Sequence, residues 1–165
     1  MKKIIQLVTA SALILFSLAT SAQQFSKADQ TVIANYSITV EKVNQFMLFE
    51  KGFGTAKAAE PKYTSLTPPR TLDEKINLLS PLPSFVKLAK SSGSNLRDIT
   101  LTGASLHILF SATDPKRQAN FLKMCDQGYA QKPSTEQMAF ANAHRADLAQ
   151  WQKQIQEYGK AELSK

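Results

Sequence analysis

The chain has 165 residues and a formal net charge of +7, with 20 Lys or Arg residues against 13 Asp or Glu. Its one cysteine, Cys125, excludes an intramolecular disulfide, so stability must come from a packed core. The lysines are scattered and are not interleaved with aromatic residues, which argues against a nucleic-acid-binding surface.

Residues 1–22 have the three parts of a bacterial secretory signal peptide. Two lysines stand at the start, residues 4–19 are largely apolar, and Thr-Ser-Ala at 20–22 offers small residues for cleavage. The strongest apolar run, 12–19, is shorter than the roughly 20 residues that a membrane-spanning helix needs. We therefore predict cleavage after Ala22 and a periplasmic or secreted product.

Cleavage would leave 143 residues with a net charge of +5, because two lysines are lost. This length suits one domain, and no later segment is apolar enough to give the mature form a stable membrane span. We expect a flexible N-terminal segment at 23–38, a single helical domain at 39–159 and a frayed tail at 160–165.

The first predicted helix of the domain begins after Thr39, a good N-cap, and ends at Lys51 with Gly52 as a left-handed terminator. Glu50 falls in the same row of this helix as Val43, among apolar residues.

Residues 53–70 then lose helical periodicity and gain three prolines. We predict a long loop here, which is either a flexible surface excursion or a segment draped across the helices by Phe53, Tyr63 and Leu66.

Two short helices follow the loop. Thr71 and Glu74 form a capping box for a helix that stops before Pro81. Ser80 and Pro81 are placed to open the next helix, which ends near Gly93.

Asn95 and Asp98 cap a helix over 96–112 that is apolar nearly all round, which predicts a buried central helix. Residues 116–129 are predicted to form a short helix closed by Gly128.

We predict a long last helix that begins at Ser134-x-x-Gln137 and ends at Tyr158. One packed seam runs along it, formed by Ala141, His144, Leu148, Trp151, Ile155 and Tyr158. The predicted fold is therefore all-α: an irregular bundle of five or six helices after a cleaved signal peptide. A simple up-down four-helix bundle is the nearest alternative.

The candidate metal ligands are few. His144 and Asp147 are three residues apart on one helix, and His107 is the other histidine. Met124 and Cys125 are soft ligands that would favour copper. The alternative is structural: His144 flanks the packed seam, Asp147 is solvated, and His107 is a partly buried histidine bonded to a backbone carbonyl.

Catalytic and cofactor motifs are absent from the sequence. It has no Gly-x-Ser-x-Gly elbow, no cysteine–histidine signature, no phosphate-cradling loop and no Cys-x-x-Cys-His. We predict no enzyme, no catalytic residue and no cofactor. Cys125 is expected to be buried, with an intermolecular bridge or a reactive thiol left open.

Two stretches resemble a known group of proteins. They are Phe140-x-x-x-His144-x-x-Asp147-Leu148 and Asn95-Leu-Arg-Asp98 followed by Leu-Thr-Gly-Ala-Ser-Leu at 101–106. Together they resemble small exported all-helical proteins of unknown function from Gram-negative bacteria. The resemblance implies an exported all-α domain and supplies no catalytic residue. Members often carry glutamate where this chain has Asp147, which keeps the charge.

The leading hypothesis is a non-enzymatic exported protein that binds another envelope protein, a peptide or a small apolar ligand. The expected binding surface is the 53–70 loop with Phe53, Tyr63 and Leu66. A metal- or haem-binding periplasmic protein using His144, Asp147 and His107 is the alternative, and a hydrolase comes third.

Overall fold

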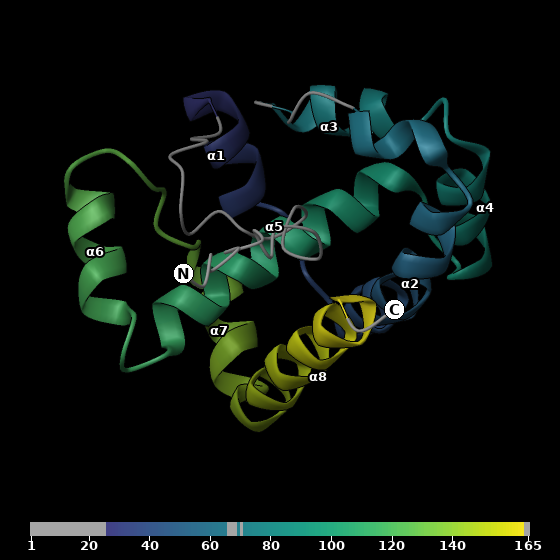
Figure 1. Cartoon of the computed structure of the whole chain (residues 1–165). Coiled ribbons are helices and arrows are strands. Elements are labelled where there is room, and N and C mark those ends of the chain that lie inside the picture. The colour runs from purple at the N-terminus through teal and green to yellow at the C-terminus, as the bar shows by residue number, and fades with distance from the viewer. Residues whose placement is uncertain (1–25, 66–68, 70, 164–165) are drawn as a thin grey trace, which may run out of the picture.

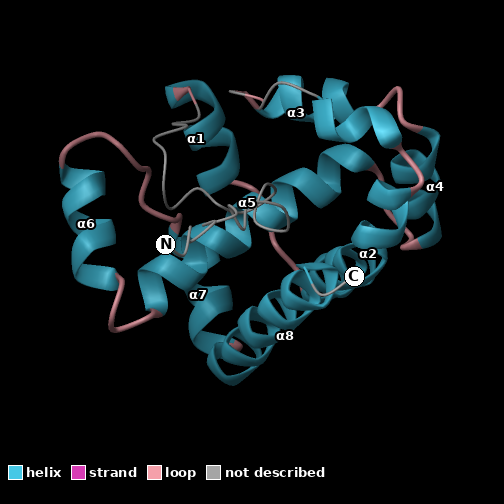
Figure 2. Ribbon diagram, viewed as in Figure 1, coloured by secondary structure: helices cyan, strands magenta, loops and turns pink. Residues whose placement is uncertain are grey.

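The computed structural model describes residues 26–65, 69 and 71–163. The predicted signal peptide, 1–22, lies outside the described residues. The described part is all-helical without a strand, which confirms the fold class (Figure 2). It contains eight α-helices, more than the five or six predicted, and one short 3-10 helix. In chain order these are α1 (Lys27–Ala34), α2 (Val40–Ala58), η1 (Pro61–Ser65), α3 (Leu72–Leu79), α4 (Pro83–Ser91), α5 (Leu96–Thr113), α6 (Gln118–Asp126), α7 (Thr135–Ala143) and α8 (Arg145–Leu163).

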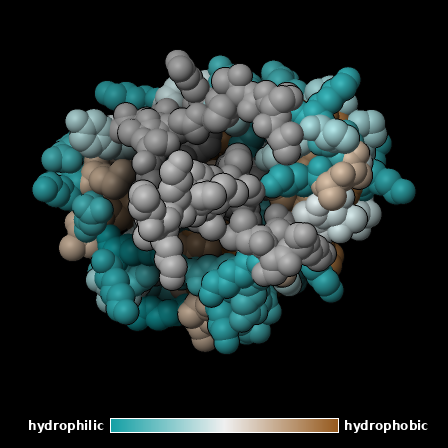
Figure 3. Space-filling model, viewed as in Figure 1, coloured by the Kyte–Doolittle hydropathy of each residue, from teal (hydrophilic) through white to brown (hydrophobic). Residues whose placement is uncertain are grey.

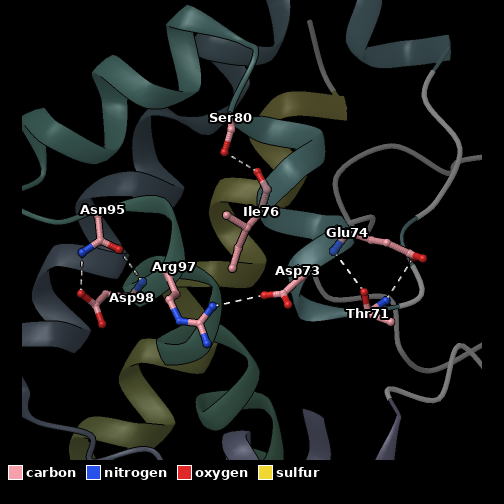
Figure 4. Close-up of polar contacts among 8 residues, drawn as sticks. All are labelled: Thr71, Asp73, Glu74, Ile76, Ser80, Asn95, Arg97 and Asp98. Carbon is pink, nitrogen blue, oxygen red and sulfur yellow. Dashed lines mark hydrogen bonds and ion pairs between the residues drawn. The ribbon is translucent and has the colours of Figure 1, made fainter. Parts of the chain in front are cut away.

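Helix α5 runs through the middle of the molecule and packs against each of the other seven α-helices (Figure 1). Twelve of its 18 residues are buried, so the predicted central buried helix is confirmed. Its first turn is held by Asn95, whose Oδ1 accepts a hydrogen bond of 2.9 Å from the backbone N–H of Asp98 (Figure 4). Apolar residues all round the helix allow it to be surrounded in this way.

The predicted capping box at the start of α3 is present. Thr71 Oγ1 accepts from the backbone N–H of Glu74 at 3.0 Å, and the Glu74 carboxylate accepts from the Thr71 N–H at 3.2 Å (Figure 4). An ion pair of 3.2 Å between Arg97 and Asp73 joins the first turn of α5 to that of α3. Both groups are exposed, so this bridge contributes little stability.

The boundary between α3 and α4 differs from the prediction by two residues. The Ser80 hydroxyl donates to the Ile76 carbonyl at 2.7 Å, and so closes α3 instead of opening α4 (Figure 4). Helix α4 begins with Pro83 in its first turn, after Leu82 as N-cap. Proline suits this position because the first helical N–H has no partner within the helix. The helix was therefore predicted correctly, but its first-turn proline is Pro83 and not Pro81.

Helix α2 does not end at Lys51 as predicted but continues through Gly52 to residue 58. A Cβ atom on Gly52 would lie 2.5 Å from Cδ1 of Leu88 on α4. The glycine therefore permits the close approach of α4, and it does not terminate the helix. Left-handed backbone among the described residues is found at Gly93 and Gly128, after α4 and α6.

The segment expected to be irregular at 23–38 contains helix α1. Ser26 caps it by accepting from the backbone N–H of Asp29 at 3.1 Å. Ile33 and Ala34 at its other end are buried. So short a helix is marginal alone in water, so its stability must come from this packing.

Buried polar groups hold α1 to the rest of the fold. The Gln137 side chain, fully buried on α7, donates to the carbonyls of Ile33 at 2.7 Å and Tyr36 at 3.0 Å. Ser105 on α5 also donates to the Ile33 carbonyl, at 3.1 Å. The Tyr36 hydroxyl donates to Asp98 at 3.0 Å, and burial, with this carboxylate, raises the pKa of Tyr36 to about 12.

The long last helix of the prediction is two helices with a break at His144. Ser134 caps α7 as predicted, and the backbone leaves helical geometry at His144, with φ −117° and ψ 32°. The His144 carbonyl then accepts from the Leu148 N–H at 2.8 Å as α8 begins. The break allows α7 to pack on α5 while α8 packs on α2. Helix α8 continues through Leu163, beyond the predicted end at Tyr158 and into the predicted frayed tail.

Candidate functional site

Two of the three residues predicted to form the binding surface at 53–70 lie in the interior of the molecule. Phe53 and Tyr63 are buried, with 4% and 8% of their surface exposed. Both rings pack on Phe85 of α4, at centroid distances of 5.1 Å and 5.2 Å. Leu66 lies outside the described residues. The exposed-loop prediction is therefore wrong for Phe53 and Tyr63, and the draped alternative describes them: aromatic packing against α4 outweighs exposure.

His144 and Asp147 do meet, at the junction of α7 and α8. Nδ1 of His144 lies 3.1 Å from a carboxylate oxygen of Asp147. The imidazole also contacts the rings of Phe140 and Trp151, at centroid distances of 4.7 Å and 6.3 Å. This arrangement fixes the junction and places the imidazole at the rim of the packed seam. It matches the structural alternative for His144.

His107 lies on α5, partly buried. Burial, together with the positive charges of Arg117 and Lys75, lowers the pKa of His107 to about 4. The imidazole is therefore neutral at physiological pH. In the part of the chain that the structure describes, no three His, Cys, Asp or Glu residues gather to hold a metal ion. His107 is thus not brought into one site with His144 and Asp147.

A buried pair of charged residues was not predicted. Glu50 on α2 and Lys75 on α3 are each 8% exposed. The pKa of Lys75 is lowered to about 8, because burial lowers it by more than the negative charge of Glu50 raises it. The sequence held a signal, because Glu50 falls in an apolar row of its helix. Such a pair costs desolvation energy, because both groups leave water.

The most distinctive surface lies on residues 114–132, which we call the α6 arm. It stands at one edge of the molecule, away from α2, α4 and α8 (Figure 1). Phe121 is the buried residue of α6, whereas Leu122, Met124 and Tyr129 are exposed. These are three of the six large apolar side chains exposed among the described residues. Apolar atoms lie between hydrophilic ones at this edge in Figure 3.

Cys125 lies on the same arm and is partly exposed, not buried as expected. Burial raises the pKa of its thiol above the ordinary value. The thiolate is the form that attacks electrophiles and binds metals, so this environment does not activate the residue. The residues of the arm were seen in the sequence as an ordinary short helix. The exposed side chains were missed because Leu122 and Met124 are apolar and close to the buried Phe121.

A scan against protein-family models, a search of curated proteins and a search of solved structures each found no match to this chain. None of the helices in the described ranges is both long and apolar enough to cross a membrane.

Proposed function

We propose that this is an exported, non-enzymatic helical protein that acts by binding, and that the α6 arm is its binding surface. The observation that carries the proposal is the grouping of Leu122, Met124 and Tyr129, exposed by 42%, 38% and 53%, within eight residues. Single exposed apolar residues need no explanation, but a group on one projecting element is typical of an interaction site. The predicted signal peptide supplies the export part of the proposal.

The α6 arm, and not the 53–70 segment, is the surface that we propose for binding. Phe53 and Tyr63 are committed to the core, so they cannot contact a partner without opening α2 from α4. Leu122, Met124 and Tyr129 can contact a partner with no rearrangement. Binding there removes apolar surface from water, worth about 25 cal/mol for each Å² buried.

The single cysteine makes the test specific. An environment-sensitive fluorophore on Cys125 reports from the arm, and the matched control is the Cys125→Ser, Ser91→Cys double variant, labelled at an exposed site on α4. Both are purified from the exporting cell and mixed with its envelope extract. We expect the emission of the label at Cys125 to shift to the blue and the motion of this label to slow. The label at the control site should show neither change. Equal responses at both sites, or none at Cys125, would overturn the proposal.

The metal- or haem-binding alternative has the pair His144–Asp147 in its favour, at 3.1 Å. Elemental analysis and an absorbance spectrum of the purified protein test it. A stoichiometric metal or a haem band that disappears in His144→Ala would favour this alternative over binding through the arm.

A further inference from the structure

The partner of the α6 arm can be specified by chemistry. Building on the proposed function, we infer that the α6 arm docks onto an anionic phospholipid surface. The arm would lie in the interface between headgroups and acyl chains. Three features favour this partner: how the apolar side chains are placed, the charge around them, and the shape of the element.

The exposed apolar residues lie on both sides of the contact with α5. Each residue of an α-helix is rotated by about 100° from the one before. Leu122 therefore lies about 100° to one side of Phe121, and Met124 about 60° to the other. Phe121 faces α5 and is only 8% exposed, so the two neighbours flank the contact and stay in solvent. Tyr129, which follows the left-handed Gly128 after the end of α6, adds a third exposed apolar side chain.

The charge of the arm is positive. It carries four exposed cations against two acids, Asp114 and Asp126; the cations are Lys116, Arg117, Lys123 and Lys132. Arg117 pairs with Asp114 at 3.5 Å and Lys132 with Asp126 at 3.2 Å. Lys116 and Lys123 form no ion pair with any residue that the structure describes. They remain available to phosphate groups, and each such contact near an anionic membrane is worth about 1 kcal/mol.

This pattern fits a lipid surface better than a second copy of the chain or a partner with a groove. The net charge, +7 for the whole chain and +5 after the predicted cleavage, opposes self-association through a positive patch. On the solvent side of the α6 arm, opposite Phe121, the exposed Leu122 and Met124 flank Lys123, so apolar atoms and a cation face outward together and can meet the headgroup layer from the same side. Lysine stems and tyrosine rings suit that layer, where one end is apolar and the other hydrated.

The test compares two triple variants of the protein purified from the exporting cell, each with its N-terminus determined by mass spectrometry. The arm variant is Lys116→Gln, Leu122→Gln, Lys123→Gln. The control is Leu48→Gln, Lys87→Gln, Lys90→Gln on α2 and α4, which removes the same exposed residue types far from the arm. Binding is measured by flotation with vesicles of phosphatidylglycerol and phosphatidylcholine in equal amounts, and with phosphatidylcholine alone. Circular dichroism confirms that both variants remain folded.

We expect the parent protein and the control to float with the anionic vesicles and not with the neutral ones. Losing two lysines should weaken binding of the arm variant by about 30-fold. Raising salt to 1 M should weaken binding of the parent, because the Debye length falls to about 3 Å. Equal binding by both variants would overturn the inference, since residues outside the arm would then carry it.

The two proposals can fail separately. If envelope extract shifts the Cys125 label while anionic vesicles do not bind, the arm binds a protein or another envelope component, and the lipid inference is wrong. If neither changes the label, both proposals are wrong. Binding to the vesicles with a shift at Cys125 supports both.

Discussion

Two segments of this molecule that carry large apolar side chains have opposite environments. The segment around η1 places Tyr63 between Phe53 of α2 and Phe85 of α4, with ring centroids 5.9 Å and 5.2 Å away. The α6 arm has α5 on one side, and its apolar residues beyond Phe121 remain in solvent. The difference shows that apolar content does not decide burial here. What decides it is whether helices enclose the segment from more than one direction.

The largest effect is expected from breaking the aromatic cluster. Phe85 is completely buried against Phe53 and Tyr63. Phe85→Ala should lower the free energy of unfolding by about 4 kcal/mol, because the side chain loses its burial and leaves a cavity. Urea denaturation followed by circular dichroism measures the change. Leu48→Ala, at a site that is 56% exposed, is the matched control and should change stability by less than about 1 kcal/mol.

The next largest effect on stability is expected from the buried charged residues Glu50 and Lys75. Lys75→Met should destabilise the fold by about 3 kcal/mol, because Glu50 would keep a buried charge without its attraction to Lys75. The double variant Glu50→Gln, Lys75→Met should recover most of that loss. Thermal unfolding of the single and double variants measures both.

Lys87→Met, at an exposed position of α4, is the control for the loss of a lysine and should be nearly neutral. Additive destabilisation by the two substitutions at 50 and 75 would show that the charges of Glu50 and Lys75 are not coupled.

The free energy of unfolding should depend on pH through the partly buried His107. The pKa of His107 is about 4 in the folded chain, against 6.5 for an exposed histidine, so the unfolded chain binds more protons between these values. The contribution of His107 to the free energy of unfolding is therefore fully present above pH 6.5 and is lost as the pH falls toward 4. Between pH 7 and pH 5 the loss should be about 2 kcal/mol.

Chemical denaturation at several pH values checks this, with His107→Gln expected to remove the slope due to His107. His144→Gln, at the half-exposed α7–α8 junction, should retain it. If His107→Gln leaves the pH dependence unchanged, the stability loss arises from other groups.

Much of the fold could be predicted from local signals. The caps at Thr71, Asn95 and Ser134 are present, because capping depends on residues within one turn. The errors arise where distant contacts decide. Gly52 reads as a terminator until Leu88 is placed against it, and the break at His144 serves the packing of α8 on α2.

The site was less predictable than the fold for the same reason. Phe53 and Tyr63 follow a break in periodicity, so the sequence indicates a loop, and only the position of Phe85 explains their burial. The exposure of Leu122 and Met124 depends on how few helices surround α6, which no local pattern reports. The His144–Asp147 contact was predictable because it lies within one turn.

The smallest effect is expected from Leu122 on the arm, where it and the adjacent Phe121 repeat the comparison on a single helix. Phe121 is 8% exposed and Leu122 is 42% exposed. Phe121→Ala should cost about 3 kcal/mol, because it detaches α6 from α5. Leu122→Gln should change the free energy of unfolding by less than about 0.5 kcal/mol, since its side chain already contacts water. Urea denaturation of the two variants decides, and a comparable loss in both would mean that Leu122 is part of the core. A stable Leu122→Gln protein that binds anionic vesicles less well would separate the role of the arm in binding from any role in folding.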